Sequence, residues 1–155
     1  MDVKSNTDKV CIIGAGSSGL AAAKTFHERG IPFDCLEREH DIGGLWNEAT
    51  DTGVVYDTTY LVSSRKYTGF EDYPFPEEYP TYPSHRETLA YLRAHALNFG
   101  ILDKIEFNTT VERAERAQDG WRVQVAGEQR PRFYRALVIA NGHHHVPRIP
   151  NIPGT

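Results

Sequence analysis

The 155-residue sequence lacks a long apolar run, and no window approaches the roughly 18 to 20 apolar residues of a membrane-spanning helix. The first ten residues, MDVKSNTDKV, contain no apolar segment of the kind that a signal peptide needs. An excess of positive charge is also absent, because the formal net charge is −4. We therefore expect neither a membrane nor a nucleic acid as a partner, and we expect a cytoplasmic protein.

Cysteine is scarce. The chain has only Cys11 and Cys35, and each lies inside an apolar run that is typical of a buried strand. No C-x-x-C pair is present, which excludes the simplest redox motif. We predict two buried, reduced thiols with a structural role.

Glycine, in contrast, is concentrated near the N-terminus. In CIIGAGSSGL, Gly14, Gly16 and Gly19 follow a short apolar run with the spacing G-x-G-x-x-G. This pattern predicts a strand over residues 9–13 and a helix over about 18–29 whose N-terminus holds a phosphate. In such a motif the first glycine permits a tight turn, the second lets the backbone approach a pyrophosphate, and the third lets the helix pack on the strand.

A second strand, PFDCLER, would end at Glu37 and complete a βαβ unit with parallel strands. An acidic side chain at this place accepts hydrogen bonds from a ribose 2′-hydroxyl and repels a 2′-phosphate, so NADP is disfavoured while FAD and NAD remain. The following segment EREHDIGGLW contains Gly43 and Gly44. Two adjacent glycines allow the backbone to run close beside an extended diphosphate.

The rest of the chain alternates between irregular and regular patterns. Residues 40–83 are rich in Gly, Tyr and Pro without a regular period, and so long an irregular segment is usually functional. Residues 84–100 predict a helix that begins with a capping box of Ser84 and Glu87 and ends at Gly100. We predict strands over 104–109, 110–116, 120–126, 132–135 and 136–142, the middle three forming a meander and the last one buried on both faces.

Four separated motifs, in the right order, resemble the flavin-containing monooxygenase family. They are the glycine turn with Glu37, the Gly-Gly-x-Trp segment that ends at Trp46, FEDYPFP with the long helix after it, and LVIANG with the proline-rich segment over 143–154. Asn141 replaces the threonine that the family usually has. The resemblance covers essentially the whole chain. It implies an α/β fold, namely a Rossmann-like FAD-binding domain with a parallel sheet and a three-stranded meander.

The resemblance also implies a function. Members of the family use NADPH and O2 to oxygenate soft nitrogen or sulfur centres of small molecules through a C4a-hydroperoxyflavin. Val62 stands where many members have asparagine. We expect no catalytic side chain and no metal ligand in this chain. The FAD contacts that the resemblance implies are Gly14, Ala15, Gly16, Ser17, Ser18, Gly19, Glu37, Arg38, Gly44, Leu45, Trp46, Val62 and Ser63.

The family's second G-x-G-x-x-G fold, which binds NADPH, and its F-x-G-x-x-x-H signature do not occur in this sequence. We therefore expect residues 1–155 to be the N-terminal part of an FAD/NAD(P)-binding domain, incomplete at the C-terminus and inactive alone. Residues 1–8 would be a lead-in and 147–155 a linker toward a missing NADPH domain. The expected partner is the missing C-terminal portion or a second copy. A Baeyer–Villiger monooxygenase fragment and a non-catalytic stand-alone nucleotide-binding module remain alternatives.

Two other groups of polar residues have simpler interpretations. Three consecutive histidines, residues 143–145, rarely chelate one ion, because neighbouring side chains of an extended chain point to opposite sides. The acidic pairs Glu71–Asp72 and Glu77–Glu78 lie among prolines and tyrosines. We interpret these pairs as solvated charges of an exposed loop.

Overall fold

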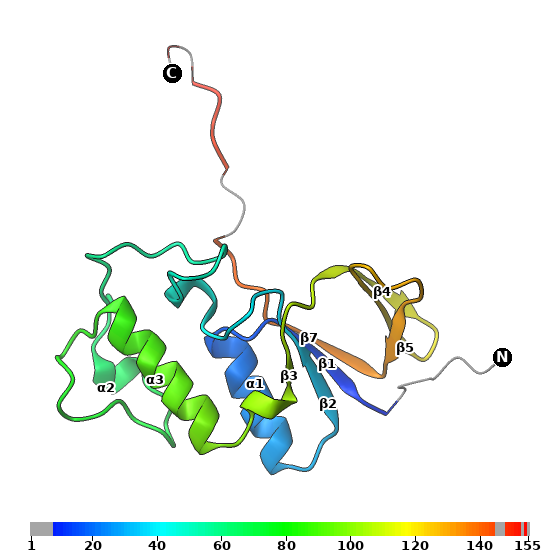
Figure 1. Ribbon diagram of the computed structural model, residues 1–155, viewed down its shortest axis with the longest axis horizontal. Coiled ribbons are helices and arrows are strands. Elements are labelled where there is room, and N and C mark those ends of the chain that lie inside the picture. Colours follow the sequence, from blue (N-terminus) through cyan, green and yellow to red (C-terminus); the bar gives the residue numbers. More distant parts are fainter. Residues whose placement is uncertain (1–7, 145–147, 153, 155) are drawn as a thin grey trace.

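A parallel sheet lies between two long helices and an antiparallel meander (Figure 1). The computed structural model describes residues 8–144, 148–152 and 154. The predicted lead-in therefore falls outside the described residues except for Asp8, and so do His145 and three positions of the predicted linker. The described part of this linker, residues 148–152 and 154, is exposed and extends away from the body in Figure 1.

The first βαβ unit forms as predicted. Strand β1 (Val10–Ile13) leads through the glycine turn into helix α1 (Ser17–Glu28), which is followed by strand β2 (Phe33–Leu36). The two strands pair in parallel, with Val10 opposite Phe33. Glu37 follows β2 directly, which places its side chain at the carboxyl edge of the sheet.

The parallel sheet has the order β3-β2-β1-β7, with β3 at Ile105–Glu106 and β7 at Ala136–Ile139. The predicted meander is confirmed as β4 (Val111–Ala117), β5 (Gly120–Val125) and β6 (Arg132–Tyr134). The prediction that the last strand is buried on both faces is wrong. Strand β7 is only half-buried, and Ile139 is 66% exposed, because β7 lies at the edge of the sheet in the described part of the chain.

Each face of the parallel sheet has its own apolar core. Ile12 and Cys35 face α1 and helix α3 (His85–Asn98), where they pack with Leu20 and Leu92. Cys11 and Leu36 face the meander and pack against its buried side chains. Alternate residues of a strand point to opposite faces, so β1 contributes to both cores. Burial is the main cause that raises the pKa of both thiols to about 12, and both cysteines are free, as predicted.

The irregular segment of residues 40–83 is held in place by contacts with helix α3. The capping box of Ser84 and Glu87 begins this helix as predicted. The Tyr91 hydroxyl accepts a hydrogen bond from the Phe70 amide (2.7 Å) and donates one to the Tyr73 carbonyl (2.6 Å). The segment contains two short elements, the 3-10 turn η1 (Gly44–Trp46) and helix α2 (Arg65–Thr68), and the 3-10 turn η2 (Leu102–Lys104) follows α3.

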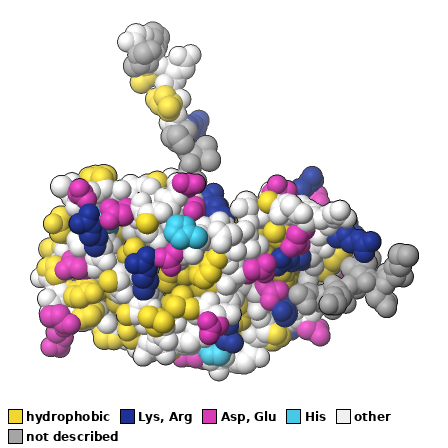
Figure 2. All heavy atoms as spheres, viewed as in Figure 1, with side chains coloured by type: hydrophobic (Ala, Val, Ile, Leu, Met, Phe, Trp, Pro, Cys, Tyr) yellow, Lys and Arg dark blue, Asp and Glu magenta, His cyan; other side chains and the backbone are white. Residues whose placement is uncertain are grey.

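The surface carries both signs of charge. Acidic and basic side chains are interspersed on the face that Figure 2 shows, without a large area of one sign. The acidic residues 71, 72, 77 and 78 are exposed, and Asp72 pairs with Lys24. No helix in the described ranges has both the length and the apolar character needed to cross a membrane.

Candidate functional site

A groove of about 540 Å³ lies at the carboxyl ends of the parallel strands. Its walls are the residues that follow β1, β2, β3 and β7. On the surface, a notch separates the helical part from the meander near the point where the C-terminal segment leaves the body (Figure 2). Open parallel sheets bind their ligands at this edge.

The first glycine turn forms one wall, and its geometry requires two of its glycines. Gly14 has a φ of +99°, and a Cβ there would lie 2.6 Å from the Ala140 carbonyl oxygen. A Cβ at Gly19 would lie 1.8 Å from the carbonyl oxygen of Gly14. Any larger side chain at either position would therefore collide with the backbone of the residues that follow β7 or of the turn that follows β1.

Gly16 differs from these two glycines. It has an ordinary φ of −73° as the N-cap of α1, and an added Cβ would meet only the Gly44 Cα at 3.8 Å. No side chain among the described residues caps the N-terminus of α1. The first amide groups of a helix have no partner within the helix and carry a partial positive charge. Gly16, Ser17 and Ser18 line the groove, so this end of α1 is suited to an anionic group.

A second glycine turn lies directly against the first. Gly43 and Gly44 have φ values of +112° and +54° and begin η1. The Gly43 amide donates a hydrogen bond to the Ala15 carbonyl (3.1 Å). A Cβ at Gly44 would lie 3.3 Å from the Gly16 Cα. The groove is therefore bordered by two backbone turns without side chains between them.

Glu37 lies beside these turns and is only 6% exposed. One carboxylate oxygen accepts a hydrogen bond from the Ala15 amide (2.5 Å), and the other accepts one from the Glu39 amide (3.0 Å). These bonds fix the carboxylate at the edge of the groove. An ionised carboxylate has about four acceptor positions, so each oxygen of Glu37 retains the capacity for a hydroxyl donor.

The groove brings together most, but not all, of the residues predicted to bind a cofactor. Ala15 and Gly19 are buried beneath it. Val62 is 99% exposed and Ser63 bonds to Thr68, and both lie on the segment before α2 rather than in the groove lining, so their role stays a prediction. The predicted residues that line the groove are Gly14, Gly16, Ser17, Ser18, Glu37, Arg38, Gly44, Leu45 and Trp46.

The sequence did not single out several residues of the groove. Thr109, Thr110 and Val111 come after β3 in the chain and line the groove, as does Thr52 of the irregular segment. One signal was available for the first three, because residues after each parallel strand meet at the ligand-binding edge. No local pattern marks Thr52.

The described residues contain one cluster with metal-ligating groups away from the groove. Atoms of Glu48, Asp57 and His85 lie within 4.8 Å of one another. The Arg86 guanidinium already bridges the two carboxylates, at 3.2 Å from Glu48 and 2.7 Å from Asp57. Because this guanidinium supplies the compensating positive charge, we assign no metal to the cluster. Of the three consecutive histidines, His143 and His144 line the groove and are not part of this cluster.

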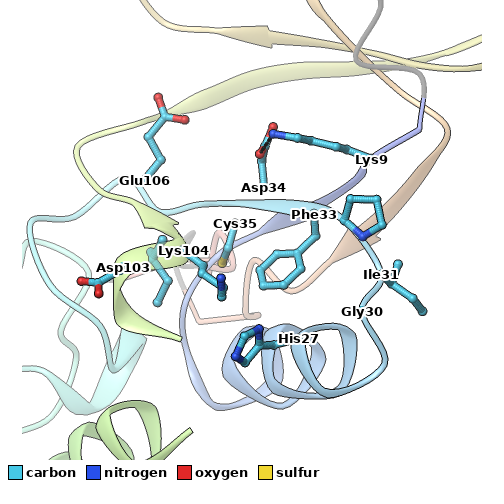
Figure 3. Close-up of a pocket in the computed structure, with 12 residues that line it drawn as sticks. Lys9, His27, Gly30, Ile31, Phe33, Asp34, Cys35, Asp103, Lys104 and Glu106 are labelled. Carbon is cyan, nitrogen blue, oxygen red and sulfur yellow. Dashed lines mark hydrogen bonds and ion pairs between the residues drawn. The ribbon is translucent and has the colours of Figure 1, made fainter. Parts of the chain in front are cut away.

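A second cavity of about 570 Å³ lies beside the amino-terminal half of β2 (Figure 3). In it Lys9 points toward Asp34, with 2.7 Å between Nζ and Oδ1, and Tyr134 donates a hydrogen bond to the other carboxylate oxygen at 3.1 Å. These three groups join β1, β2 and β6 and stabilise the contact between the two sheets. The cavity is about as large as the groove, but it is lined by the turn after the C-terminus of α1, at Gly30, and not by the N-terminus of α1 or α3.

Comparison with known proteins places this chain among flavin-binding monooxygenase-like proteins. The family model for flavin-binding monooxygenase-like proteins matches residues 7–154. Flavin-containing monooxygenase 5 of Rattus norvegicus is 33% identical over 159 residues, covering 94% of this chain and 30% of that protein. Dimethylaniline monooxygenase [N-oxide-forming] 2 of Oryctolagus cuniculus is 35% identical with the same coverage.

Solved structures agree with this assignment. S-allyl-L-cysteine S-oxygenase from Allium sativum has a TM-score of 0.83 at 28% identity, over 98% of this chain and 40% of that one. A structure of OTEMO in complex with FAD and NADP has a TM-score of 0.78 at 26% identity, over 98% of this chain and 29% of that one. The chain spans about 30% of the length of the curated relatives it matches. It belongs to the flavin-binding monooxygenase-like family, whose members are flavin-dependent oxidoreductases.

Proposed function

We propose that this chain binds FAD in the groove at the carboxyl edge of its parallel sheet. One observation carries the proposal: the uncapped N-terminus of α1, two glycine turns in contact and a buried, oriented carboxylate meet in one groove. Anionic phosphates suit the helix terminus, and ribose hydroxyls suit the carboxylate. The cofactor in the OTEMO structure and the family membership support FAD as the dinucleotide.

Each wall of the groove has a role in this proposal. The amides of Gly16, Ser17 and Ser18 would hold the diphosphate, and the adjoining turn at Gly44 would continue this wall without a side chain in the way. Glu37 would accept hydrogen bonds from the adenosine ribose and would repel a 2′-phosphate, which favours FAD over NADP. Leu45 and Trp46 continue the wall beyond the second turn. FAD, when bound, supplies the redox chemistry with O2, and the protein binds and orients it.

We further propose that the whole protein oxygenates soft nitrogen or sulfur centres of small molecules. The names of two similar proteins support this class, since one forms N-oxides and the other is an S-oxygenase. Reduction of the flavin by NADPH would need a second dinucleotide-binding fold, and residues 8–144 contain one such fold. In this proposal the described domain holds the flavin, and catalysis requires more than this domain.

The binding proposal is tested by titrating the chain with FAD and NADP while following flavin fluorescence and calorimetric heat. The key variant is Gly16→Ala. Its methyl group would make only an ordinary van der Waals contact with Gly44, so the fold accepts it, but it would narrow the groove at the helix terminus. We expect this variant to melt close to the wild type without ligand and to bind FAD at least about tenfold more weakly, which corresponds to about 1.4 kcal/mol.

Glu37→Gln is the matched test of nucleotide choice, since it preserves size while removing the negative charge. We expect it to weaken FAD binding and to reduce the discrimination against NADP. Tighter binding of NADP than of FAD by the wild-type chain would overturn the assignment. Equal FAD affinity of the wild type and Gly16→Ala would show that the diphosphate does not lie against the first turn.

A further inference from the structure

Asn47 lies immediately after the Gly-Gly-Leu-Trp segment and is only 1% exposed. Its side-chain amide donates hydrogen bonds to Asp41 Oδ2 (3.1 Å) and to the Ile42 carbonyl (3.0 Å), and its Oδ1 accepts one from the Ala49 amide (3.2 Å). Both side-chain protons and the oxygen are therefore in use. The carboxamide bonds to residues on each side of the Gly43–Trp46 segment and closes it into a loop.

The loop is also fixed to helix α3. Arg93 forms an ion pair with Asp41, the same carboxylate that accepts from Asn47. Burial alone would raise the pKa of Asp41, but hydrogen bonds from Arg93, the Ile42 amide and Asn47 lower it. Leu89 of α3 lies under Gly43, where an added Cβ would be 2.4 Å from its Cδ1. Helix α3 therefore supports the second glycine turn through one polar and one apolar contact.

Backbone bonds transmit this support to the groove. The Asn47 amide donates to the Gly44 carbonyl (3.1 Å), and the Trp46 amide donates to the Gly43 carbonyl (3.2 Å). The Gly43 amide in turn donates to Ala15 in the first turn. Between the carboxamide of Asn47 and the first turn there is thus a continuous series of hydrogen bonds that passes through the second turn.

We propose that Asn47 is a positioning residue for the cofactor groove. Together with Asp41 and Arg93 it holds the Gly43–Gly44 turn against the Gly14–Ser18 turn and so sets the shape of the groove wall that the two turns form together. This inference rests on the proposed FAD site, because the shape of this wall matters only for a ligand that lies along both turns. Asn47 does not line the groove itself, so its effect on the ligand passes through the two glycines.

The physical reason for this role is the free-energy cost of removing the Asn47 carboxamide while its hydrogen-bond partners remain. Truncation at residue 47 would leave the buried Ile42 carbonyl without this partner. It would also remove one hydrogen bond from the Asp41 carboxylate, which keeps Arg93, and one from the Ala49 amide. Buried polar groups without partners are unfavourable, so the loop would rearrange to reach water. A rearranged loop would no longer hold Gly44 beside Gly16. The fold as a whole depends on other contacts, namely the two cores on the faces of the sheet.

The test compares Asn47→Ala with Val123→Ala, a cavity-forming control in the meander core at a residue that does not line the groove. Hydrogen exchange of the Gly43 and Asn47 amides reports the second turn without any ligand, and FAD titration reports the groove. We expect Asn47→Ala to speed exchange at these amides selectively and to weaken FAD binding about tenfold. Val123→Ala should lower the melting temperature while changing FAD affinity less than about twofold. Asp41→Asn, which removes the Arg93 ion pair at constant volume, replaces Asn47→Ala if that variant does not fold.

The outcomes separate the two proposals. If the wild-type chain binds no FAD, the proposed function fails. The hydrogen-exchange rate of the Gly43 amide in Asn47→Ala, compared with the wild type, then decides whether Asn47 holds the turn. If the wild type binds FAD and Asn47→Ala binds it equally well, the positioning role is overturned, whatever the exchange rates are. Equal losses of FAD affinity in Asn47→Ala and Val123→Ala would also overturn it, because a general loss of stability would then explain both.

Discussion

His95 of helix α3 is a buried imidazole that makes the stability of the fold depend on pH. It is 1% exposed, and its ring centroid lies 4.3 Å from that of Phe70 and 4.9 Å from that of Phe99. Its Nδ1 has no hydrogen-bond partner within the described residues. Burial, and secondarily the positive charge of Lys24, lower the pKa of His95 from 6.5 to about 4, against a smaller opposing effect of Glu28.

The sign of the effect follows from this lowered pKa. Below pH 6.5 the unfolded chain binds a proton at His95, whereas the folded chain binds it only near pH 4. The contribution of neutral His95 is therefore intact above pH 6.5 and is lost as the pH falls toward 4. Integration between these two pKa values gives a loss of about 2 kcal/mol from pH 7 to pH 5 and about 3 kcal/mol in total.

Urea denaturation at pH 7, 6 and 5 measures this loss, with His95→Leu as the test variant and His27→Gln as the control. The leucine fills the aromatic site without a titrating group, so the free energy of unfolding should become nearly constant over this range. His27 is exposed, so its replacement removes an imidazole without changing the buried aromatic site around His95. Carboxylates that titrate at lower pH, including Asp41, remain in all three proteins and cancel in the comparison.

A parallel decrease of stability in the wild type and in His95→Leu would refute this reasoning. It would mean that the folded protein protonates the imidazole without cost, which is incompatible with a dry aromatic environment. If the pH dependence of the unfolding free energy disappeared only in His27→Gln, the titrating group would lie on the surface of α1 instead.

The remaining predictions concern the sheet. Gly19→Ala should destabilise the fold by about 3 kcal/mol in urea titrations, because its Cβ would lie 1.8 Å from the Gly14 carbonyl oxygen; a gain of stability, as is usual for Gly→Ala inside a helix, would contradict the packing. We also expect the isolated chain to self-associate through β7, which is an edge strand in the described part and exposes Ile139. Light scattering should rise with protein concentration and should fall in Ile139→Lys, whereas a monodisperse wild type would contradict this interface.

Much of the fold was predictable because its signals are local. The glycine spacing and the apolar run before it specify β1, the turn and α1, since turn geometry and helix packing act within ten residues. Ser84 and Glu87 specify the beginning of α3 through two hydrogen bonds between neighbours. The alternation of apolar and polar residues over 120–126 predicts β5, whose Val123 and Val125 are buried in the core beneath the meander.

The unpredicted parts depend on contacts between distant segments. ALVI is apolar whether its strand is central or at an edge, so composition alone could not show that β7 is half-exposed. Thr109 and Thr110 carry no motif and enter the groove only because β3 pairs with β2. Asn47 is one polar residue in an irregular segment, and its importance comes from Asp41 and Arg93, which pattern analysis does not bring together.

The glycines of the first turn are needed for two different reasons, the packing of the fold and the approach of a ligand, and the spacing of the motif does not distinguish them. Gly14 and Gly19 are required by the fold itself, because any Cβ would collide with backbone atoms even without a ligand. Gly16 is under no such demand, since its φ is ordinary and its surroundings admit a methyl group. The spacing of glycines therefore predicts a strand, a turn and a helix with more force than it predicts a bound nucleotide. The fold itself tolerates a methyl group at Gly16, so an effect of Gly16→Ala on FAD binding can be attributed to the ligand. The FAD affinity of this variant is therefore the measurement that connects the fold with the proposed function.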